Sequence, residues 1–130
     1  MYKVLVVEDD PFIVRLYTKT LEHEGFQVQV ADNGLSALEQ IPVFKPDIIL
    51  LDIMMPTMNG MEFMQQTQNQ APIIVLTNMA EPSVANDAVN AGAKLVLVKS
   101  ETEPDGVVSA INSILGQTNQ PAAEAPAPQQ

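Results

Sequence analysis

Four consecutive apolar residues, Ile48–Leu51, lead directly into the carboxylate of Asp52, and a loop containing Pro56 and Gly60 follows. A short apolar run with turn residues beyond it is typical of a strand that is buried on both faces. Because an ionised carboxylate is costly to bury, we expect Asp52 at the carboxyl end of this strand, where the chain leaves the core. Open parallel sheets place their ligands at that edge, so the pattern predicts a functional site around Asp52.

Four other segments also have the character of strands. Continuous apolar runs at residues 4–7, 73–76 and 95–98 predict further strands of a covered sheet. Residues 27–30 alternate between polar and apolar side chains, which is typical of a half-exposed strand at the edge of a sheet. The chain therefore contains five predicted strands.

Apolar residues at helical spacing follow each predicted strand. Capping and stop residues indicate where the five helices begin and end: Asp10 with Pro11 and Gly25, Asn33 and Pro42, Gly60 and Gln68, Ser83 and Gly92, Pro104 and Gly116. Strands alternating with helices predict an α/β fold, a flavodoxin-like (βα)5 doubly wound parallel sheet. The edge character of residues 27–30 favours the strand order 2-1-3-4-5.

The composition changes after Gly116. Residues 117–130 contain no Leu, Ile, Val or aromatic residue and are rich in Pro, Ala and Gln. Such a segment cannot bury enough apolar surface to offset the entropy that is lost on ordering. We therefore expect one domain over residues 1–116, followed by a disordered tail or linker over residues 117–130.

The chain has 16 acidic and 6 basic residues among its 130, which gives a net charge of -10. This charge argues against direct binding of nucleic acid, which draws on clustered Lys and Arg. Without cysteine, neither a disulfide framework nor a thiolate metal site can form. No apolar run approaches the roughly 20 residues of a membrane span, and the first residues enter a strand pattern without room for a signal peptide. We expect a cytoplasmic protein that does not bind membranes.

Polar residues stand at the carboxyl ends of the predicted strands: Glu8, Asp9, Asp52, Thr77 and Lys99. In a parallel sheet these ends lie along one edge, so we expect the five side chains to converge. Carboxylates held this close repel one another, since two unit charges 4 Å apart interact by about 4 kcal/mol at an effective dielectric of 20. A divalent cation relieves this repulsion, and oxygen ligands without His or Cys favour Mg²⁺.

A carboxylate beside Mg²⁺ can act as a nucleophile toward phosphorus, because the metal can hold an incoming phosphoryl group in line with it. Lys99 adds positive charge, and the Thr77 hydroxyl can donate to a phosphoryl oxygen. Taken singly, these residues have simpler explanations, since acids after a strand usually form a solvated loop and a terminal lysine is usually a solvated charge. Their joint placement at one edge favours a phosphoryl-transfer site.

The motifs at these positions resemble one known family. From Tyr2 to Gly116 the chain is similar to the CheY-like receiver domains of response regulators, the phosphate-accepting components of two-component signalling. The resemblance is carried by Val6–Asp10, Leu51–Gly60, Leu76–Thr77, Ala91–Ala93 and Lys99. It implies a signalling domain, and not an ordinary enzyme, that takes phosphate from a partner histidine kinase or phosphotransfer protein.

The resemblance also implies a role for each site residue. Asp52 would be the phosphoacceptor. Asp9 would bind Mg²⁺ directly, Glu8 would act largely through water, and Met54 would contribute its backbone carbonyl.

On the same grounds, Thr77 and Lys99 would contact the phosphoryl group. Movement of Thr77 would reshape the face formed by the fourth helix, fifth strand and fifth helix, where a downstream protein would bind. Two departures from the family pattern affect this switch, because Val96 replaces the usual Tyr or Phe and Ser100 replaces the usual proline. A cis peptide bond before Ser100 is not expected, since it would cost about 2.5 to 4 kcal/mol.

Three more departures lie close to the site in the sequence. The positions that tune hydrolysis of the phosphorylated form in relatives are Met54 and Met79 here. Neither side chain can orient an attacking water, so we predict a comparatively long-lived phosphoaspartate. Asn78 stands where relatives commonly have a smaller residue and could narrow the access to Asp52.

Three other functions are compatible with parts of the pattern. A receiver-like interaction module that works without phosphate is favoured by Val96 and Ser100, although the retained site residues weigh against it. A phosphohydrolase would need a second acid near Asp52, which Ile53 and Met54 do not supply. A flavin or dinucleotide binder is disfavoured because no Gly-rich phosphate loop follows the first strand.

Overall fold

The computed structural model describes residues 2–52, 60–67, 71–77 and 82–119. A sheet of five parallel strands in the order β2-β1-β3-β4-β5 lies at its centre. The strands are β1 (Lys3–Val7), β2 (Gln27–Ala31), β3 (Ile48–Asp52), β4 (Ile73–Thr77) and β5 (Leu95–Val98). The helices are α1 (Pro11–His23), α2 (Gly34–Phe44), α3 (Gly60–Thr67), α4 (Pro82–Asn90), the short 3-10 helix η1 (Lys99–Glu101) and α5 (Pro104–Asn119). The predicted flavodoxin-like fold and its strand order are confirmed.

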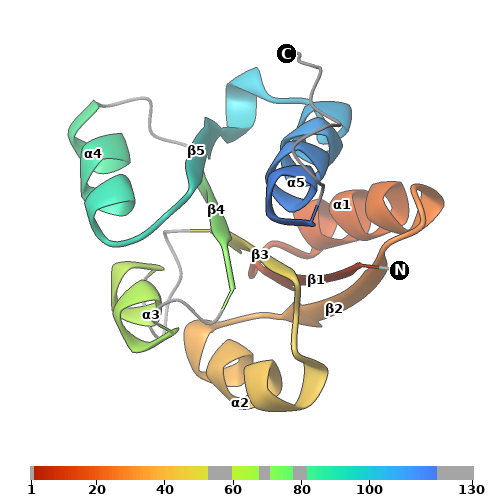
Figure 1. Ribbon diagram of the computed structural model, residues 1–130, viewed down its shortest axis with the longest axis horizontal. Helices are drawn as coiled ribbons and strands as arrows, with labels where there is room; N and C mark the ends of the chain where they lie inside the picture. Colours follow the sequence, from red (N-terminus) through yellow and green to blue (C-terminus); the bar gives the residue numbers. More distant parts are fainter. Residues whose placement is uncertain (1, 53–59, 68–70, 78–81, 120–130) are drawn as a thin grey trace.

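Helices cover both faces of the sheet, with α1 and α5 on one face and α2, α3 and α4 on the other (Figure 1). Alternate residues of β1 belong to different cores. Leu5 and Val7 pack with α2, α3 and α4, whereas Val4 and Val6 pack with α1 and α5. Because both faces are covered, the central strands are buried along their length and appear in the sequence as continuous apolar runs.

The two edge strands are β2 and β5. Exposure alternates along β2, where Gln27 and Gln29 are exposed while Val28 and Val30 are half-buried, so the predicted edge position is confirmed. All four residues of β5 are half-buried, although the strand is entirely apolar. An edge strand has a neighbour on one side alone, which explains this partial exposure.

Two helices begin as their capping residues predict. The Asp10 carboxylate accepts a hydrogen bond from the backbone N–H of Phe12 at 2.9 Å, and Pro11 occupies the first helical position of α1. Asn33 Oδ1 accepts from the backbone N–H of Ser36 at 2.8 Å at the start of α2. These side chains stabilise backbone N–H groups that a helix cannot pair internally.

The predicted end of α2 at Pro42 is wrong, because the helix continues to Phe44. A proline removes its own N–H donor, but near the end of a helix the chain can still complete the last turn. The helix ends at Lys45, which adopts a left-handed conformation (φ 55°) and donates its backbone N–H to Ile41 O at 2.8 Å. That conformation is the one that commonly terminates helices.

The predicted end of α5 at Gly116 is also wrong, because the helix continues to Asn119. A glycine ends a helix when it adopts a positive φ, as Gly25 (94°) and Gly92 (118°) do after α1 and α4. Gly116 does not have a positive φ. The tail predicted over residues 117–130 therefore overlaps the end of α5, and residues 120–130 lie outside the described residues. None of the described helices has the length and apolar character to cross a membrane.

Candidate functional site

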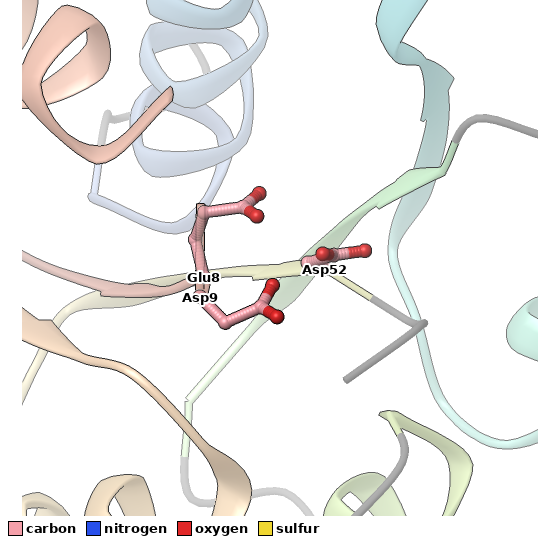
Figure 2. Close-up of side chains that lie close together, drawn as sticks. All are labelled: Glu8, Asp9 and Asp52. Atoms are coloured by element: carbon pink, nitrogen blue, oxygen red, sulfur yellow. The ribbon is translucent and has the colours of Figure 1, made fainter. Parts of the chain in front are cut away.

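Three carboxylates meet at the carboxyl edge of the sheet. Glu8 and Asp9 follow β1, and Asp52 is the last residue of β3. The two strands are adjacent, with Val7 opposite Leu51, so the acids leave the sheet at the same place. One oxygen from each acid lies within 4.8 Å of the others, and Figure 2 shows Glu8 and Asp9 extending toward Asp52. The fold thus brings Asp52 close to two acids that lie 44 and 43 positions earlier in the sequence.

The three acids differ in their exposure to solvent. Glu8 is 2% exposed and Asp52 is 6% exposed, whereas Asp9 is exposed. The backbone N–H of Glu8 donates to Ala31 O at 3.0 Å. This hydrogen bond continues the β1–β2 ladder by one residue and fixes the backbone of Glu8 at the end of the sheet. Because burying an ionised carboxylate is costly, Glu8 and Asp52 need a positive charge close by.

Lys99 provides this positive charge. It directly follows β5, and its Nζ lies 2.7 Å from Glu8 Oε1 and 3.4 Å from Asp52 Oδ2. The Lys99 side chain is 11% exposed, and the hydrogen bond joins residues 91 positions apart. The sequence predicts Lys99 at this edge as a contact of a phosphoryl group, but it does not predict the pairing with Glu8.

The protonation of Glu8 and Lys99 reflects their burial and their pairing. Burial raises the pKa of Glu8 from 4.5 to about 7, with a further contribution from the charge of Asp52, while the hydrogen bond from Lys99 acts in the opposite direction. Burial lowers the pKa of Lys99, but the hydrogen bond to Glu8 and the charge of Asp52 outweigh it and leave the pKa above its ordinary value. Lys99 is therefore a stable cation, whereas Glu8 can exchange a proton near neutral pH.

Thr77 completes the set of residues at this edge. It is the last residue of β4, the strand next to β3, and is 1% exposed. Asp52 pairs with Leu76 in the ladder, so Thr77 lies one position further along the neighbouring strand. The remaining residues that the sequence indicated near the site lie outside the described residues: Met54, Asn78 and Met79.

Two contributors to the site are not predicted by the sequence. The backbone N–H of Asp10 donates to Glu8 Oε2 at 3.2 Å, so Glu8 is held through both of its oxygens. The second is Tyr17 of α1, which is 4% exposed and lies near Glu8 and Lys99. Burial raises the pKa of Tyr17 against the opposing charge of Lys99. Helical spacing indicates that Tyr17 faces inward, but it does not indicate which distant side chains it meets.

A groove of about 740 Å³ opens beside the acids, between α1 and β2. Glu8 and Asp9 line it together with Arg15 and Lys19 of α1 and Asp32 after β2. The exposed carboxylate of Asp9 is therefore accessible from outside the molecule.

The donor set of the site fits Mg²⁺. The side-chain atoms that could bind a cation are carboxylate oxygens, with no His or Cys among the described residues of the cluster, and hard cations prefer such ligands. Mg²⁺ usually binds through one or two carboxylates and retains several waters, which suits a site with one exposed and two buried acids. A carboxylate in such a site can also act as a nucleophile toward phosphorus.

Comparison with known proteins identifies the family that this chain resembles. The sequence model of the family described as the response regulator receiver domain matches residues 4–112. The chain is 36% identical over 118 residues to the chemotaxis protein CheY of Bacillus subtilis (strain 168), which covers 88% of this chain and 98% of that protein. It is 36% identical over 100 residues to the response regulator MprA of Mycobacterium ulcerans, where the match covers 75% of this chain and 43% of that protein.

Solved structures show the same similarity in three dimensions. The Francisella response regulator 1452 receiver domain superposes with a TM-score of 0.85 at 26% identity, covering 92% of this chain and all (100%) of that chain. The chemotaxis response regulator CheY4 of Vibrio cholerae has a TM-score of 0.81 at 31% identity, covering 88% of this chain and 98% of that chain.

Proposed function

This chain belongs to the response regulator receiver family, and we propose that it is a phosphorylation-dependent signalling switch whose phosphoacceptor is Asp52. The phosphoryl group would come from a histidine kinase or phosphotransfer protein in an Mg²⁺-dependent step. The observation that carries the proposal is the cluster of Glu8, Asp9 and Asp52, whose oxygens lie within 4.8 Å of one another beside Lys99.

In the proposed step, a carboxylate oxygen of Asp52 attacks the phosphorus of the donor's phosphohistidine. A P–O bond forms while the P–N bond breaks, and the electron pair of the P–N bond returns to the imidazole nitrogen. The products are an acyl phosphate on Asp52 and a free histidine on the donor. Mg²⁺ held by the acids of the site would supply charge neutralisation for the phosphoryl oxygens.

The other residues of the site position and neutralise the transferring group. We assign Asp9 as a direct ligand of Mg²⁺, Glu8 as a ligand acting through water, and the backbone carbonyl of Met54 as a further ligand. The Thr77 hydroxyl and the Lys99 ammonium would bind phosphoryl oxygens. The position of Lys99, 3.4 Å from Asp52 Oδ2, supports this role, because a short movement would carry the ammonium to a phosphoryl oxygen.

Beryllofluoride, which mimics a phosphoryl group on a carboxylate, tests the assignment of Asp52. In the presence of Mg²⁺, the wild type should bind beryllofluoride saturably, as followed by fluorine NMR, and Asp52→Asn should abolish the bound signal. Asp87→Asn is the matched control, because Asp87 is an exposed acid on α4, away from the carboxyl edge. Binding that persists in Asp52→Asn, or that is absent from the wild type, would contradict the proposal.

We propose the face formed by α4, β5 and α5 as the surface that binds a downstream protein. Two observations support this assignment: β5 is a half-buried edge strand, and Val89 of α4 is 53% exposed. Residues 117–119 continue α5, and we propose that the segment beyond them is a tail or linker. The exchange of phosphate would take place in the cytoplasm, without direct contact with nucleic acid.

A second candidate is a receiver-like interaction module that works without phosphate. Val96 supports it, because an aliphatic side chain replaces the ring that relatives commonly carry at this position of β5. Ser100 also supports it, since the Lys99–Ser100 bond is trans, as expected, where relatives often have a cis proline. The beryllofluoride experiment distinguishes the two functions, because a module of this kind predicts no saturable binding at Asp52.

A further inference from the structure

The two edge strands of the sheet are protected to different degrees. On β2, Gln27 and Gln29 are exposed polar residues, and Gln40 of α2 donates from its Nε2 to Val30 O at 3.1 Å. Because the backbones of Gln27 and Ala31 bond to β1, the alternation along the strand directs the Val30 carbonyl away from β1. A helix side chain therefore closes part of the open edge of β2.

The opposite edge strand, β5, is less well protected. Its sequence is Leu-Val-Leu-Val, with no charged residue, polar residue or proline, and all four residues are half-buried. Alternate residues of a strand direct their N–H and C=O groups to the same side, so about half of these groups in β5 point away from β4. Within the described part of the chain, no other element forms a hydrogen bond with them. An uncovered apolar edge of this kind can pair with a further strand.

Acidic residues surround the carboxyl end of β5. Three exposed carboxylates follow the strand, on η1 and around the start of α5: Glu101, Glu103 and Asp105. Asp87 of α4 is also exposed, and α4 and α5, which lie on either side of β5 in Figure 1, contain no Lys or Arg. Lys94 is exposed at the amino end of β5, whereas Lys99 is 11% exposed and pairs with two acids of the site. The charge around β5 therefore favours a basic partner.

From these observations we propose that β5 binds an extended, basic segment of a partner protein, which adds a strand to the open edge of the sheet. Backbone hydrogen bonds along β5 provide the affinity, and apolar side chains of the segment cover the exposed parts of the strand. Lys or Arg residues of the segment pair with the acids that follow β5. The inference rests on the proposed function for the surface formed by α4, β5 and α5, and adds the backbone conformation and charge of the partner.

A second copy of this chain fits the same edge less well. Each copy has a net charge of -10. Pairing two β5 strands would bring together two sets of the acids described above, against one exposed lysine, Lys94, from each copy. Like charges that meet in an interface oppose association, so a separate, basic partner is the favoured occupant.

A short synthetic peptide that alternates Val with Lys, with both ends blocked, is the probe that tests the inference. Titrated into the isotope-labelled full chain, it should bind saturably and shift the backbone amide resonances of β5, while those of β2 stay unchanged. Replacing each Lys of the peptide with Glu should weaken binding at least about tenfold. Methylating every backbone nitrogen should weaken it by a similar factor, about tenfold, because the peptide keeps its charge but can donate no backbone hydrogen bond.

Charge-neutralising variants of the protein test the contribution of the acids. The triple variant Glu101→Gln, Glu103→Gln, Asp105→Asn should bind the Lys peptide about tenfold more weakly than the wild type. The matched control removes three exposed acids in or next to α1 and α2, the helices that flank β2: Glu22→Gln, Glu24→Gln and Glu39→Gln. It should bind as the wild type does. Circular dichroism checks the fold, because two of the replaced acids lie at the start of α5. If the triple variant does not fold, the three peptides compared on the wild type provide the test.

Four results would overturn the inference: no saturable binding of the Lys peptide, equal binding of the methylated peptide, shifts confined to residues outside β5, or equal weakening in both triple variants. Association of the wild type into dimers through β5, measured by analytical ultracentrifugation and NMR, would also overturn it.

Titrations with and without beryllofluoride and Mg²⁺ separate this inference from the proposed function. If the wild type binds beryllofluoride but the Lys peptide binds in neither state, the role of β5 is wrong and the phosphoacceptor assignment stands. If the peptide binds β5 but beryllofluoride does not bind, the inference about β5 stands and the proposed switch is wrong.

Discussion

Glu8 is the residue in which burial and charge are most closely linked. It is an acid with 2% of its surface exposed, and it is held by Lys99 on one oxygen and by the Asp10 backbone on the other. These contacts keep the carboxylate in a fixed position beside Asp52. The charge on Glu8 therefore determines how many negative charges Lys99 must neutralise.

The protonation of Glu8 predicts a pH dependence for the metal-free protein. Because burial raises the pKa of Glu8 from 4.5 to about 7, the folded chain binds more protons than the unfolded chain between these values. The contribution of Glu8 to stability is therefore fully present below pH 4.5 and is lost as the pH rises to about 7. Over this window the free energy of unfolding of the wild type should fall by about 1 to 3 kcal/mol relative to that of Glu8→Gln.

Urea unfolding in the presence of a chelator measures this difference. Both proteins should be followed by circular dichroism at several pH values that span the window. Comparison with Glu8→Gln removes the contributions of the other acids, which titrate in both proteins. Parallel pH profiles for the two proteins would show that Glu8 does not have the raised pKa.

Met54 and Met79, which lie two positions after Asp52 and Thr77 in the sequence, are the subject of a second prediction. If the phosphoaspartate is long-lived because Met54 and Met79 cannot orient water, replacing Met54 with Asn and Met79 with Glu should speed the loss of phosphate several-fold. The decay of radiolabelled phosphate on Asp52 measures this rate. Met64→Leu is a suitable control, because Met64 of α3 is buried in the core that α2, α3 and α4 form with the sheet. Equal decay rates in the double variant and the wild type would show that the two methionines do not determine the lifetime of the phosphoaspartate.

Among the elements, α2 departs most clearly from local sequence preferences. Pro42 lies within the helix, so the carbonyl of Leu38 lacks the N–H donor that another residue at position 42 would supply. The helix is held instead by its buried residues, such as Ala37, Ile41 and Phe44. In addition, the Lys3 ammonium donates to Phe44 O at 3.2 Å and supports the end of the helix. Packing against the sheet thus outweighs the local cost of the proline.

Replacing this proline should stabilise the protein. In Pro42→Ala the new N–H can donate to the Leu38 carbonyl, and we expect the free energy of unfolding to rise by about 1 kcal/mol. The gain should be smaller than the roughly 3 kcal/mol cost of a proline in a helix interior, because position 42 is close to the end of α2. Chemical unfolding measures the change. Val43→Ala, at a site that is 83% exposed, is the control and should alter stability little. A loss of stability in Pro42→Ala would contradict the expectation.

For the whole molecule, stability comes from two apolar cores on opposite faces of one sheet. Each core joins residues from distant segments, and the core beneath α1 and α5 includes Tyr17, Val107 and Leu115. The carboxyl edge of the sheet is held in place by both cores. The site therefore depends on the assembly of the entire domain and not on any single loop.

Truncation of the chain tests where this assembly ends. A protein ending at Asn119 should unfold at the same temperature as the full chain, because residues 120–130 contain no Leu, Ile, Val or aromatic side chain that could join a core. A protein ending at Ser113 loses Leu115, which is 2% exposed, and Ile114, which packs against the same core, so its stability should fall by at least about 3 kcal/mol. Calorimetric unfolding of the three proteins measures both effects. A clear loss of stability on removal of residues 120–130 would show that the domain extends beyond α5.

Local patterns in the sequence predicted the elements of this fold well. Asp10 and Asn33 cap the helices at the expected positions, and the alternation at residues 27–30 correctly indicated an edge strand. These features depend on contacts within a few residues, so they can be read from neighbouring positions. The ends of α2 and α5 were not predicted, because Pro42 and Gly116 are held in helices by packing that their neighbours in the sequence do not reveal.

The sequence by itself determined which residues stand at the carboxyl ends of the strands, because strand polarity and apolar runs are local properties. The tertiary structure alone decided that Lys99 pairs with Glu8 across 91 positions, that Glu8 is buried while Asp9 is exposed, and that Tyr17 lies near both members of the pair. Partner choice among several nearby charges depends on distances of a few tenths of an ångström and on burial. These distances and this burial arise when the strands and helices pack together, so they cannot be predicted from a local pattern in the sequence.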